Sequence, residues 1–365
     1  MRIVAQGLTY TYNPKSPFAS QALKGVDLSI EEGEFFGIIG HTGSGKSTFV
    51  QHLNALIRCT GGKLQVGEFD LTDKKCDFLR LRSKVGMVFQ YPEYQLFAET
   101  AEKDVEFGLK NFCKEMDEAQ RAQAVREAIE TVGLDYDAIR DRSPFELSGG
   151  QKRRVAIAGV IVTKPEVLIL DEPAAGLDPL GKKELMDLLH SIHGGWCKTV
   201  IIVSHDMDEI AENCTRAAVF SEGRVVLCGT PAEIFSRDEK LFSLGLDVPT
   251  TAHCALLLRK HGIRIDTDFT CDDFAQKVLS LWQAERGEGQ GSAAVKENSA
   301  AAKDSEEDSS PVAVKENSAA AKDSEGDSSP AATQENFDAA KDSEGDSSAA
   351  ETKSADGQGG DGDAE

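Results

Sequence analysis

The sequence predicts an α/β protein with a mainly parallel central sheet, and three observations support this fold class. Strand-like and helix-like patterns alternate from residue 33 to residue 228, as expected when parallel strands are connected through helices. The runs 35–39 and 167–170 are continuously apolar, which is typical of strands buried on both faces. A glycine-rich loop at 40–48 joins the first of these runs to a predicted helix at 49–56.

The chain is strongly acidic, but its charge is unevenly distributed. Of 365 residues, 62 are acidic and 40 are basic, which gives a net charge of −22. The segment from Gly287 onward contributes −14 of this charge. An acidic balance disfavours nucleic acid, whose phosphates attract basic surfaces, so we expect no nucleic-acid partner.

The eight cysteines are scattered and contain no CxxC pair. This pattern indicates reduced, mostly buried thiols in a cytosolic protein, and a zinc site is the less favoured alternative. The chain has no basic-then-apolar leader and no apolar run approaching the length of a membrane span. We therefore expect it neither to cross a membrane nor to carry a signal peptide.

The first strands of the chain precede the glycine-rich loop. Residues 2–32 alternate apolar and polar side chains around a turn-rich loop at 13–17, which predicts antiparallel strands. Tyr10 or Tyr12 at this edge could stack on a base. For either tyrosine alone, a half-buried strand residue is the default interpretation.

The glycine-rich loop has the pattern of a phosphate-binding P-loop, because it lies between a strand and a helix and ends in Lys-Ser. Glycines allow backbone N–H groups to turn toward a polyphosphate, and the following helix presents its positive end to the same anion. A lysine here reaches the β- and γ-phosphates, and the next hydroxyl ligates Mg²⁺. A chance glycine-rich turn is the alternative. The residues expected to bind the phosphate chain are Gly40, His41, Thr42, Gly43, Ser44, Gly45, Lys46, Ser47 and Thr48.

Two further strands are predicted at 61–66 and 85–90, and the second ends in Gln90. A glutamine after a buried strand usually just begins a loop. In a P-loop protein it can instead reach the metal or the attacking water. The stretch 99–141 is helical in pattern, with an apolar face on the segment 116–129.

The segment Leu147-Ser148-Gly149-Gly150-Gln151 leads into a predicted helix at 153–162. The strand 167–170 then ends in Asp171 and Glu172. A strand-terminal aspartate is the expected Mg²⁺ partner in P-loop enzymes, although such a pair often only caps a helix. A helix at 181–193 and a strand at 199–203 lead to His205. A single histidine in this position is more often structural. His205, however, follows the carboxyl end of a strand, where open α/β sheets bind ligands.

Two segments follow this α/β region. Residues 237–286 have moderate apolar content and predict a small appended helical domain. From 287 to 365 an acidic, alanine-rich unit recurs with a period of 19 residues. Such units cannot bury enough apolar surface to offset chain entropy, so this tail is predicted to be disordered.

In this order, the motifs resemble the ATP-binding-cassette (ABC) ATPase family over residues 1–236, with a helical subdomain at about 93–163. The resemblance implies that Asp171 holds Mg²⁺ together with Ser47 and Gln90, and that Glu172 is the general base, assisted by His205 and Gln90. It implies adenine stacking on Tyr12, a D-loop role for Asp178, and a signature motif at 147–151 that binds the ATP held by a partner cassette.

The match is narrower around 40–43, 91–100, 102–105 and 153–159, where the chain resembles ATPases of energy-coupling factor importers, and most of all the second of their two paralogous ATPase subunits. This implies a peripheral protein on the cytoplasmic face of the cell membrane. Its implied partners are a second cassette, more often a paralogue than a copy, a transmembrane coupling subunit received by residues 91–97, and a membrane substrate-binding subunit. The implied cargo is a vitamin or a transition-metal ion.

Two other functions compete with this one. A soluble cassette ATPase acting on nucleic acid or ribosomes is disfavoured by the acidic balance and by the absence of a long charged coiled-coil insertion. A nucleotide-binding regulator without turnover is disfavoured by the presence of both Glu172 and His205. Ala174, where many relatives have Thr or Ser, is not at a catalytic position, and we interpret it as neutral.

Overall fold

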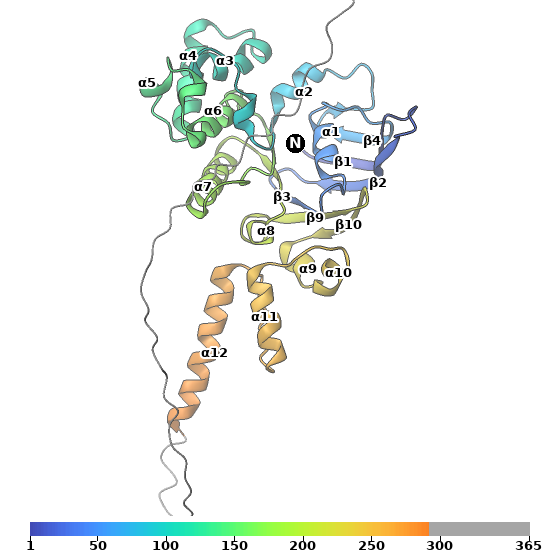
Figure 1. The fold of residues 1–365 in the computed structure, drawn as a ribbon, viewed down its shortest axis with the longest axis vertical. Helices are drawn as coiled ribbons and strands as arrows, with labels where there is room; N and C mark the ends of the chain where they lie inside the picture. The colour runs from blue at the N-terminus through green and yellow to red at the C-terminus, as the bar shows by residue number, and fades with distance from the viewer. Residues whose placement is uncertain (292–365) are drawn as a thin grey trace, which may run out of the picture. The chain divides into compact units, whose positions relative to one another are not determined.

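The computed structural model describes residues 1–291, and its core is a six-stranded sheet in the order β10-β9-β3-β8-β7-β6 (Figure 1). The strands from β9 to β6 are parallel, and only β10 runs antiparallel to its neighbour. The predicted α/β core with a mainly parallel sheet is therefore confirmed. The strand bounds are β3 Phe35–Ile39, β6 Val85–Val88, β7 Val167–Asp171, β8 Thr199–Val203, β9 Arg216–Ser221 and β10 Arg224–Gly229.

A second sheet is antiparallel, as the alternating pattern of residues 2–32 predicts, with the order β2-β1-β4-β5. The Lys24 N–H donates to the Gly223 carbonyl at 2.8 Å, which joins β2 to the turn between β9 and β10. The Gly223 N–H in turn donates to the Ser44 carbonyl at 2.9 Å, so the second sheet lies beside the second half of the P-loop. The strand bounds are β1 Ile3–Tyr12, β2 Ser20–Ile30, β4 Gly61–Val66 and β5 Phe69–Asp70.

Every residue of β3 is buried, because the parallel sheet is covered on both faces. Successive side chains of a strand point to opposite faces, and β3 divides its side chains accordingly. Phe35 and Ile39 pack in the core on the side of the helical region. Phe36 and Ile38 pack in a second core with the antiparallel sheet and α1. The helices that pack against this sheet include α1 Lys46–Leu53, α2 Phe78–Lys84, α7 Pro179–Gly195 and α8 Met207–Asn213.

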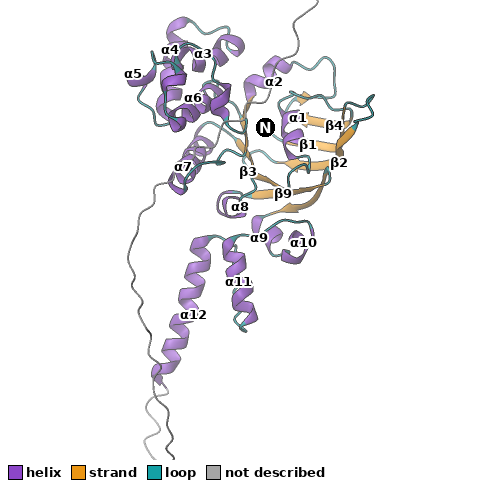
Figure 2. Ribbon diagram, viewed as in Figure 1, coloured by secondary structure: helices purple, strands orange, loops and turns teal. Residues whose placement is uncertain are grey.

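A helical region is inserted between β6 and β7 and lies to one side of the strands (Figure 2). Its longer helices begin at side-chain caps, with Thr100, Asp117 and Ser148 each accepting a backbone N–H. The helix predicted from residue 153 begins at Gly149, because Ser148 and Gln151 form a capping box. The elements are η1 Pro92–Gln95, α3 Ala101–Phe112, α4 Glu118–Thr131, α5 Tyr136–Ile139, η2 Pro144–Glu146 and α6 Gly149–Ile161.

The residues after β10 are helical, with α9 Pro231–Phe235, α10 Asp238–Ser243, α11 Thr250–Lys260 and α12 Cys271–Gly291. Helix α12 continues past residue 287, where the composition changes. The predicted disorder from residue 292 to residue 365 lies outside the described residues. Within residues 1–291, none of the helices combines the length and the apolar character needed to cross a membrane.

Candidate functional site

The P-loop connects β3 to α1, and its lysine side chain folds back onto the carbonyl groups of the loop. The Lys46 Nζ donates to the carbonyl oxygens of Gly40 at 2.6 Å and His41 at 3.1 Å. Burial lowers the pKa of the Lys46 ammonium, and the carboxylates of Glu172 and Asp171 act in the opposite direction. The loop therefore presents a buried cation next to two acidic side chains.

The oxygen groups beside the lysine fit a magnesium ion and a phosphate chain. The Ser47 hydroxyl hydrogen-bonds to the Asp171 carboxylate, and burial raises the pKa of that carboxyl while the bond to Ser47 opposes the rise. A hydroxyl and a carboxylate are oxygen ligands of the kind that Mg²⁺ prefers. The Ser44 hydroxyl is fully buried in the same loop and has no hydrogen-bond partner.

Glu172 is the point on which the predicted catalytic residues converge. Its Oε2 accepts a hydrogen bond from the Gln90 Nε2 at 2.8 Å and lies 3.5 Å from the His205 Nδ1. Its backbone has a positive φ of 50° and its N–H donates to the Val203 carbonyl at 2.9 Å. The end of β8 thus fixes the backbone that aims this carboxylate at Gln90. Of the three residues expected to hold Mg²⁺, Ser47 and Asp171 are bonded to each other. The third, Gln90, bonds to Glu172 instead.

A set of polar contacts behind His205 was missed by sequence reasoning. The Ser204 hydroxyl donates to the Glu209 carboxylate at 2.5 Å, and burial raises the pKa of Glu209. The Lys182 Nζ lies 2.8 Å from the Asp206 carboxylate, which links α7 to the loop that carries His205. The only local signal was Asp206 before a helix, since this residue accepts backbone N–H bonds as the cap of α8.

Tyr12 lies beside the helix that follows the P-loop. Its hydroxyl is 3.2 Å from the Thr48 hydroxyl, and its ring packs edge-on against Tyr10. The Tyr10 ring in turn packs edge-on against the buried His52. Tyr12 remains 36% exposed at this position, so part of its ring is accessible to a base bound next to the P-loop.

The signature segment is separate from this cluster. Leu147 is buried and anchors the segment, whereas Ser148, Gly149 and Gly150 are exposed at the start of α6. Ser148 and Gln151 exchange hydrogen bonds with each other. Asp178 accepts the Gly181 N–H and caps α7. Within residues 1–291, neither segment hydrogen-bonds to the P-loop.

Comparison with known proteins places this geometry in a family. A family model described as ABC transporter matches residues 23–175. An energy-coupling factor transporter ATP-binding protein EcfA2 from Clostridioides difficile is 47% identical over 283 residues, covering 77% of this chain and 98% of the relative. A protein of the same name from Symbiobacterium thermophilum is 49% identical over 291 residues, covering 79% of this chain and 99% of the relative.

Solved structures agree with these relatives. The structure of cbiO1 from Clostridium perfringens, part of the ABC transporter complex cbiONQ, aligns with a TM-score of 0.57 at 37% identity, covering 69% of this chain and 97% of that one. The dimeric cassette MJ0796 bound to ADP and Pi aligns with a TM-score of 0.57 at 30% identity, covering 63% of this chain and 98% of that one. The chain is therefore an ATP-hydrolysing member of the ABC transporter family and belongs to the ATP-binding subunits of energy-coupling factor transporters.

Proposed function

We propose that the P-loop and the Gln90–Glu172–His205 cluster form the ATP hydrolysis site of this chain. The observation that carries the proposal is the convergence of Gln90 and His205 on one carboxylate oxygen of Glu172, at 2.8 and 3.5 Å. A general base must be held within hydrogen-bonding reach of its water and must keep its orientation during the reaction. Two polar neighbours and a fixed backbone give Glu172 that orientation.

In the proposed reaction, water attacks the γ-phosphorus and forms a new P–O bond while the bond to the departing ADP oxygen breaks. Glu172 accepts the proton of the water. Lys46, which here bonds to the loop carbonyls, would bind the β- and γ-phosphates, and Ser47 and Asp171 would hold Mg²⁺. When bound, Mg²⁺ neutralises phosphate charge. Gln90 and His205 orient the carboxylate, and Tyr12 stacks on the adenine.

The active unit in this proposal is a pair of cassettes. Ser148, Gly149 and Gly150 are exposed at the N-terminus of a 13-residue helix, an arrangement that favours binding of an anion. Since these residues do not bond to the P-loop of their own chain, they are available to the γ-phosphate held by a second cassette. Asp178 belongs to the same interface, and a paralogous partner is favoured over a second copy by the similarity to the EcfA2 proteins.

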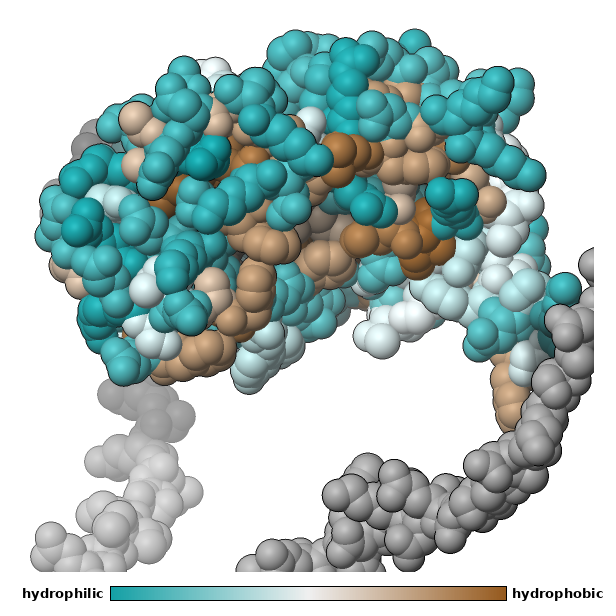
Figure 3. All heavy atoms as spheres, turned by 90° about the horizontal axis from the view of Figure 1, so that it is seen from above, coloured by the Kyte–Doolittle hydropathy of each residue, from teal (hydrophilic) through white to brown (hydrophobic). Residues whose placement is uncertain are grey.

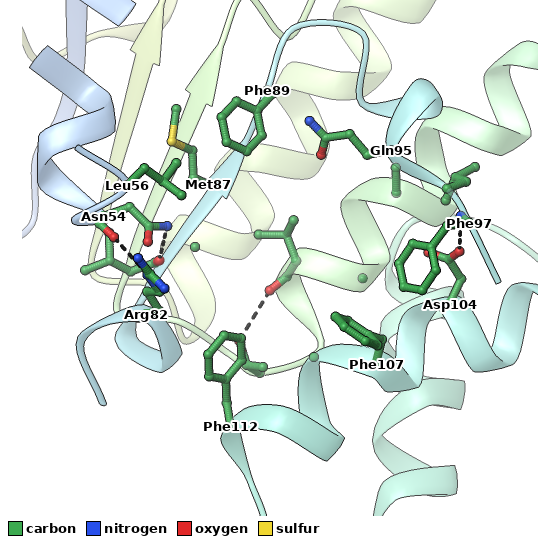
Figure 4. Close-up of a pocket in the computed structure, with 18 residues that line it drawn as sticks. Asn54, Leu56, Arg82, Met87, Phe89, Gln95, Phe97, Asp104, Phe107 and Phe112 are labelled. Atoms are coloured by element: carbon green, nitrogen blue, oxygen red, sulfur yellow. Dashed lines mark hydrogen bonds between the residues drawn. The ribbon is translucent and has the colours of Figure 1, made fainter. Parts of the chain in front are cut away.

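The proposed docking site for the membrane coupling subunit is an apolar groove of about 300 Å³ between β6, α3 and α6 (Figure 4). Phe97 and Phe107 pack edge-on at 4.9 Å on one side of it. Of the predicted stretch 91–97, residues 95–97 line this groove, whereas Tyr91 lines the pocket beside Glu172. Figure 3 shows hydrophobic patches framed by hydrophilic side chains on the face of the molecule that carries α2 and α3.

The proposed role is to power import of a vitamin or a transition-metal ion from the cytoplasmic face of the cell membrane. The cargo is selected by a separate membrane substrate-binding subunit. Support comes from the names of the relatives, which are energy-coupling factor transporter proteins, and from the cbiO1 structure. The position of the groove also supports the proposal, because Phe89 and Gln95, which line it, lie on either side of Gln90 in the chain.

The proposal is tested by affinity purification of a tagged Glu172→Gln variant with MgATP from gently solubilised membranes. Recovery of a second cassette together with a polytopic membrane protein supports it. Recovery from the soluble fraction only, with ribosomes or nucleic acid, would show that the ATPase serves another process. A Ser148→Arg variant is the matched control, because a bulky cation at the signature should prevent closure of the cassette pair.

A further inference from the structure

Arg153 is a buried cation whose bonding capacity is largely unused. It lies in α6, only 7% exposed, and its Nη1 donates to the Ala175 carbonyl at 2.9 Å. Its Nε and Nη2 are buried and have no hydrogen-bond partner. A guanidinium carries five N–H donors, and unpaired donors on a buried charge are costly to the fold.

Glu93 in η1 holds the complementary group. Its Oε2 is also buried and without a hydrogen-bond partner, and η1 packs against α6. Burial lowers the pKa of the Arg153 guanidinium, and the Glu93 carboxylate acts against this effect. The structure thus places two orphaned donors and one orphaned acceptor of opposite charge in neighbouring elements.

Both residues connect to the segments that hold Glu172. Arg153 bonds to Ala175, whose own N–H donates to the Glu172 carbonyl at 3.2 Å. Glu93 lies three residues after Gln90, which donates to the Glu172 carboxylate. A bond between Arg153 and Glu93 would therefore close a ring of contacts around the catalytic carboxylate.

We propose that Arg153 is a positioning residue for Glu172, and that its Nε and Nη2 pair with the Glu93 carboxylate in the catalytically active arrangement. Such pairing satisfies all three orphaned atoms at once, in the two-pronged geometry that arginine and carboxylate favour. It holds the Gln90 loop and the Ala175 loop at a fixed separation. The proposal deepens the role proposed for Glu172 and rests on it.

The test is a double-mutant cycle on ATP turnover by the full-length chain in its purified assembly, with Arg153→Met, Glu93→Gln and the double variant. Each single variant should lower kcat by on the order of tenfold, since a small misplacement of a catalytic group is costly, while the KM for ATP stays within about twofold. The double variant should be no slower than the slower single variant, because the residues act as a pair. Arg153→Lys, which keeps the charge but loses the fork, should recover part of the rate.

Arg154→Met provides the matched control. Arg154 neighbours Arg153 but bonds to the Val132 carbonyl and to Glu184, both at 2.6 Å. Its effect on kcat should multiply with that of Glu93→Gln. The pairing would be overturned if the loss of kcat in the double variant equalled the product of the losses in Arg153→Met and Glu93→Gln. It would also be overturned if kcat were unchanged in both single variants.

A purely structural role is separated by stability. Glu93 is only half-buried and its carboxylate does not bond to Arg153 in the structure, so nucleotide-free Glu93→Gln should unfold at a temperature close to that of wild type, although its kcat falls. A joint loss of stability and activity in this variant would contradict the proposal. Glu172→Gln is the reference variant, and retained ATP turnover in it would refute the role of Glu172 itself. Slow turnover in Glu172→Gln together with wild-type turnover in Glu93→Gln and Arg153→Met would refute only the pairing.

Discussion

Replacing Gly45 with alanine tests whether contact with the antiparallel sheet fixes the P-loop. Gly45 caps α1 with a φ of 102°, a conformation that side chains rarely adopt. A methyl group on Gly45 would lie 2.7 Å from the Ala22 carbonyl oxygen and 3.1 Å from Leu23 Cδ2. Since Ala22 and Leu23 belong to β2, the added carbon must push the P-loop away from this strand.

Gly43 offers a matched comparison within the same loop. Its φ is 80°, but a methyl group there would meet no heavy atom within 4 Å. A left-handed alanine costs about 1–2 kcal/mol, and overpacking against fixed atoms costs about 1–3 kcal/mol more. The expected loss of unfolding free energy is therefore about 1–2 kcal/mol for Gly43→Ala and about 2–5 kcal/mol for Gly45→Ala.

The measurement is urea unfolding of the full-length variants without nucleotide, followed by intrinsic fluorescence. Nucleotide is omitted because both glycines lie in the phosphate-binding loop and ATP would stabilise the variants unequally. Gly45→Ala should unfold at a lower urea concentration than Gly43→Ala. Equal midpoints, or a lower midpoint for Gly43→Ala, would refute the argument that contact with β2 positions the loop.

Three further predictions follow from the site. Lys46→Ala should lose tight MgATP binding in calorimetric titration, and near-normal affinity would contradict its role at the phosphates. Glu172→Gln should still bind MgATP but turn it over on the order of 10²–10⁴-fold more slowly and accumulate as a closed pair in size-exclusion chromatography; wild-type turnover would remove Glu172 from the mechanism. Glu209→Gln should be more stable than wild type at neutral pH. Burial raises the pKa of Glu209 in the folded chain above its ordinary value. Ionisation of Glu209 therefore destabilises the fold as the pH rises through this raised pKa. The advantage should vanish in urea titrations below pH 4.5, the ordinary glutamate value, and a pH-independent difference would contradict this origin.

Sequence reasoning located the strands best, because a fully buried strand has a continuous apolar signature. The bounds predicted for 35–39 and 199–203 coincide with β3 and β8, in which every residue is buried. Helix starts were less accurate, since they depend on caps. Because Ser148 is the N-cap, α6 begins at Gly149, four residues earlier than predicted, and the last three residues of the signature segment lie in its first turn.

The contacts within the site could not be predicted from residue spacing. Gln90 and Glu172 are 82 positions apart, yet they share a hydrogen bond. The orphaned atoms of Glu93 and Arg153 have no sequence signature at all, because arginines and glutamates are common on helix surfaces. Their significance arises only from burial, which depends on how η1 and α6 pack.

The order of the strands explains why these distant residues meet. Strands β3, β8, β7 and β6 are adjacent and parallel, and their carboxyl ends therefore lie along one edge of the sheet. These ends carry the P-loop, His205, Asp171 with Glu172, and Gln90, in that spatial order. The order along the chain is different, since Gln90 precedes Glu172 and the helical region separates them. Each of these catalytic side chains lies at the end of a strand or just after it. The positions of the four strand ends are therefore strictly constrained, whereas the connections between the strands can vary in length.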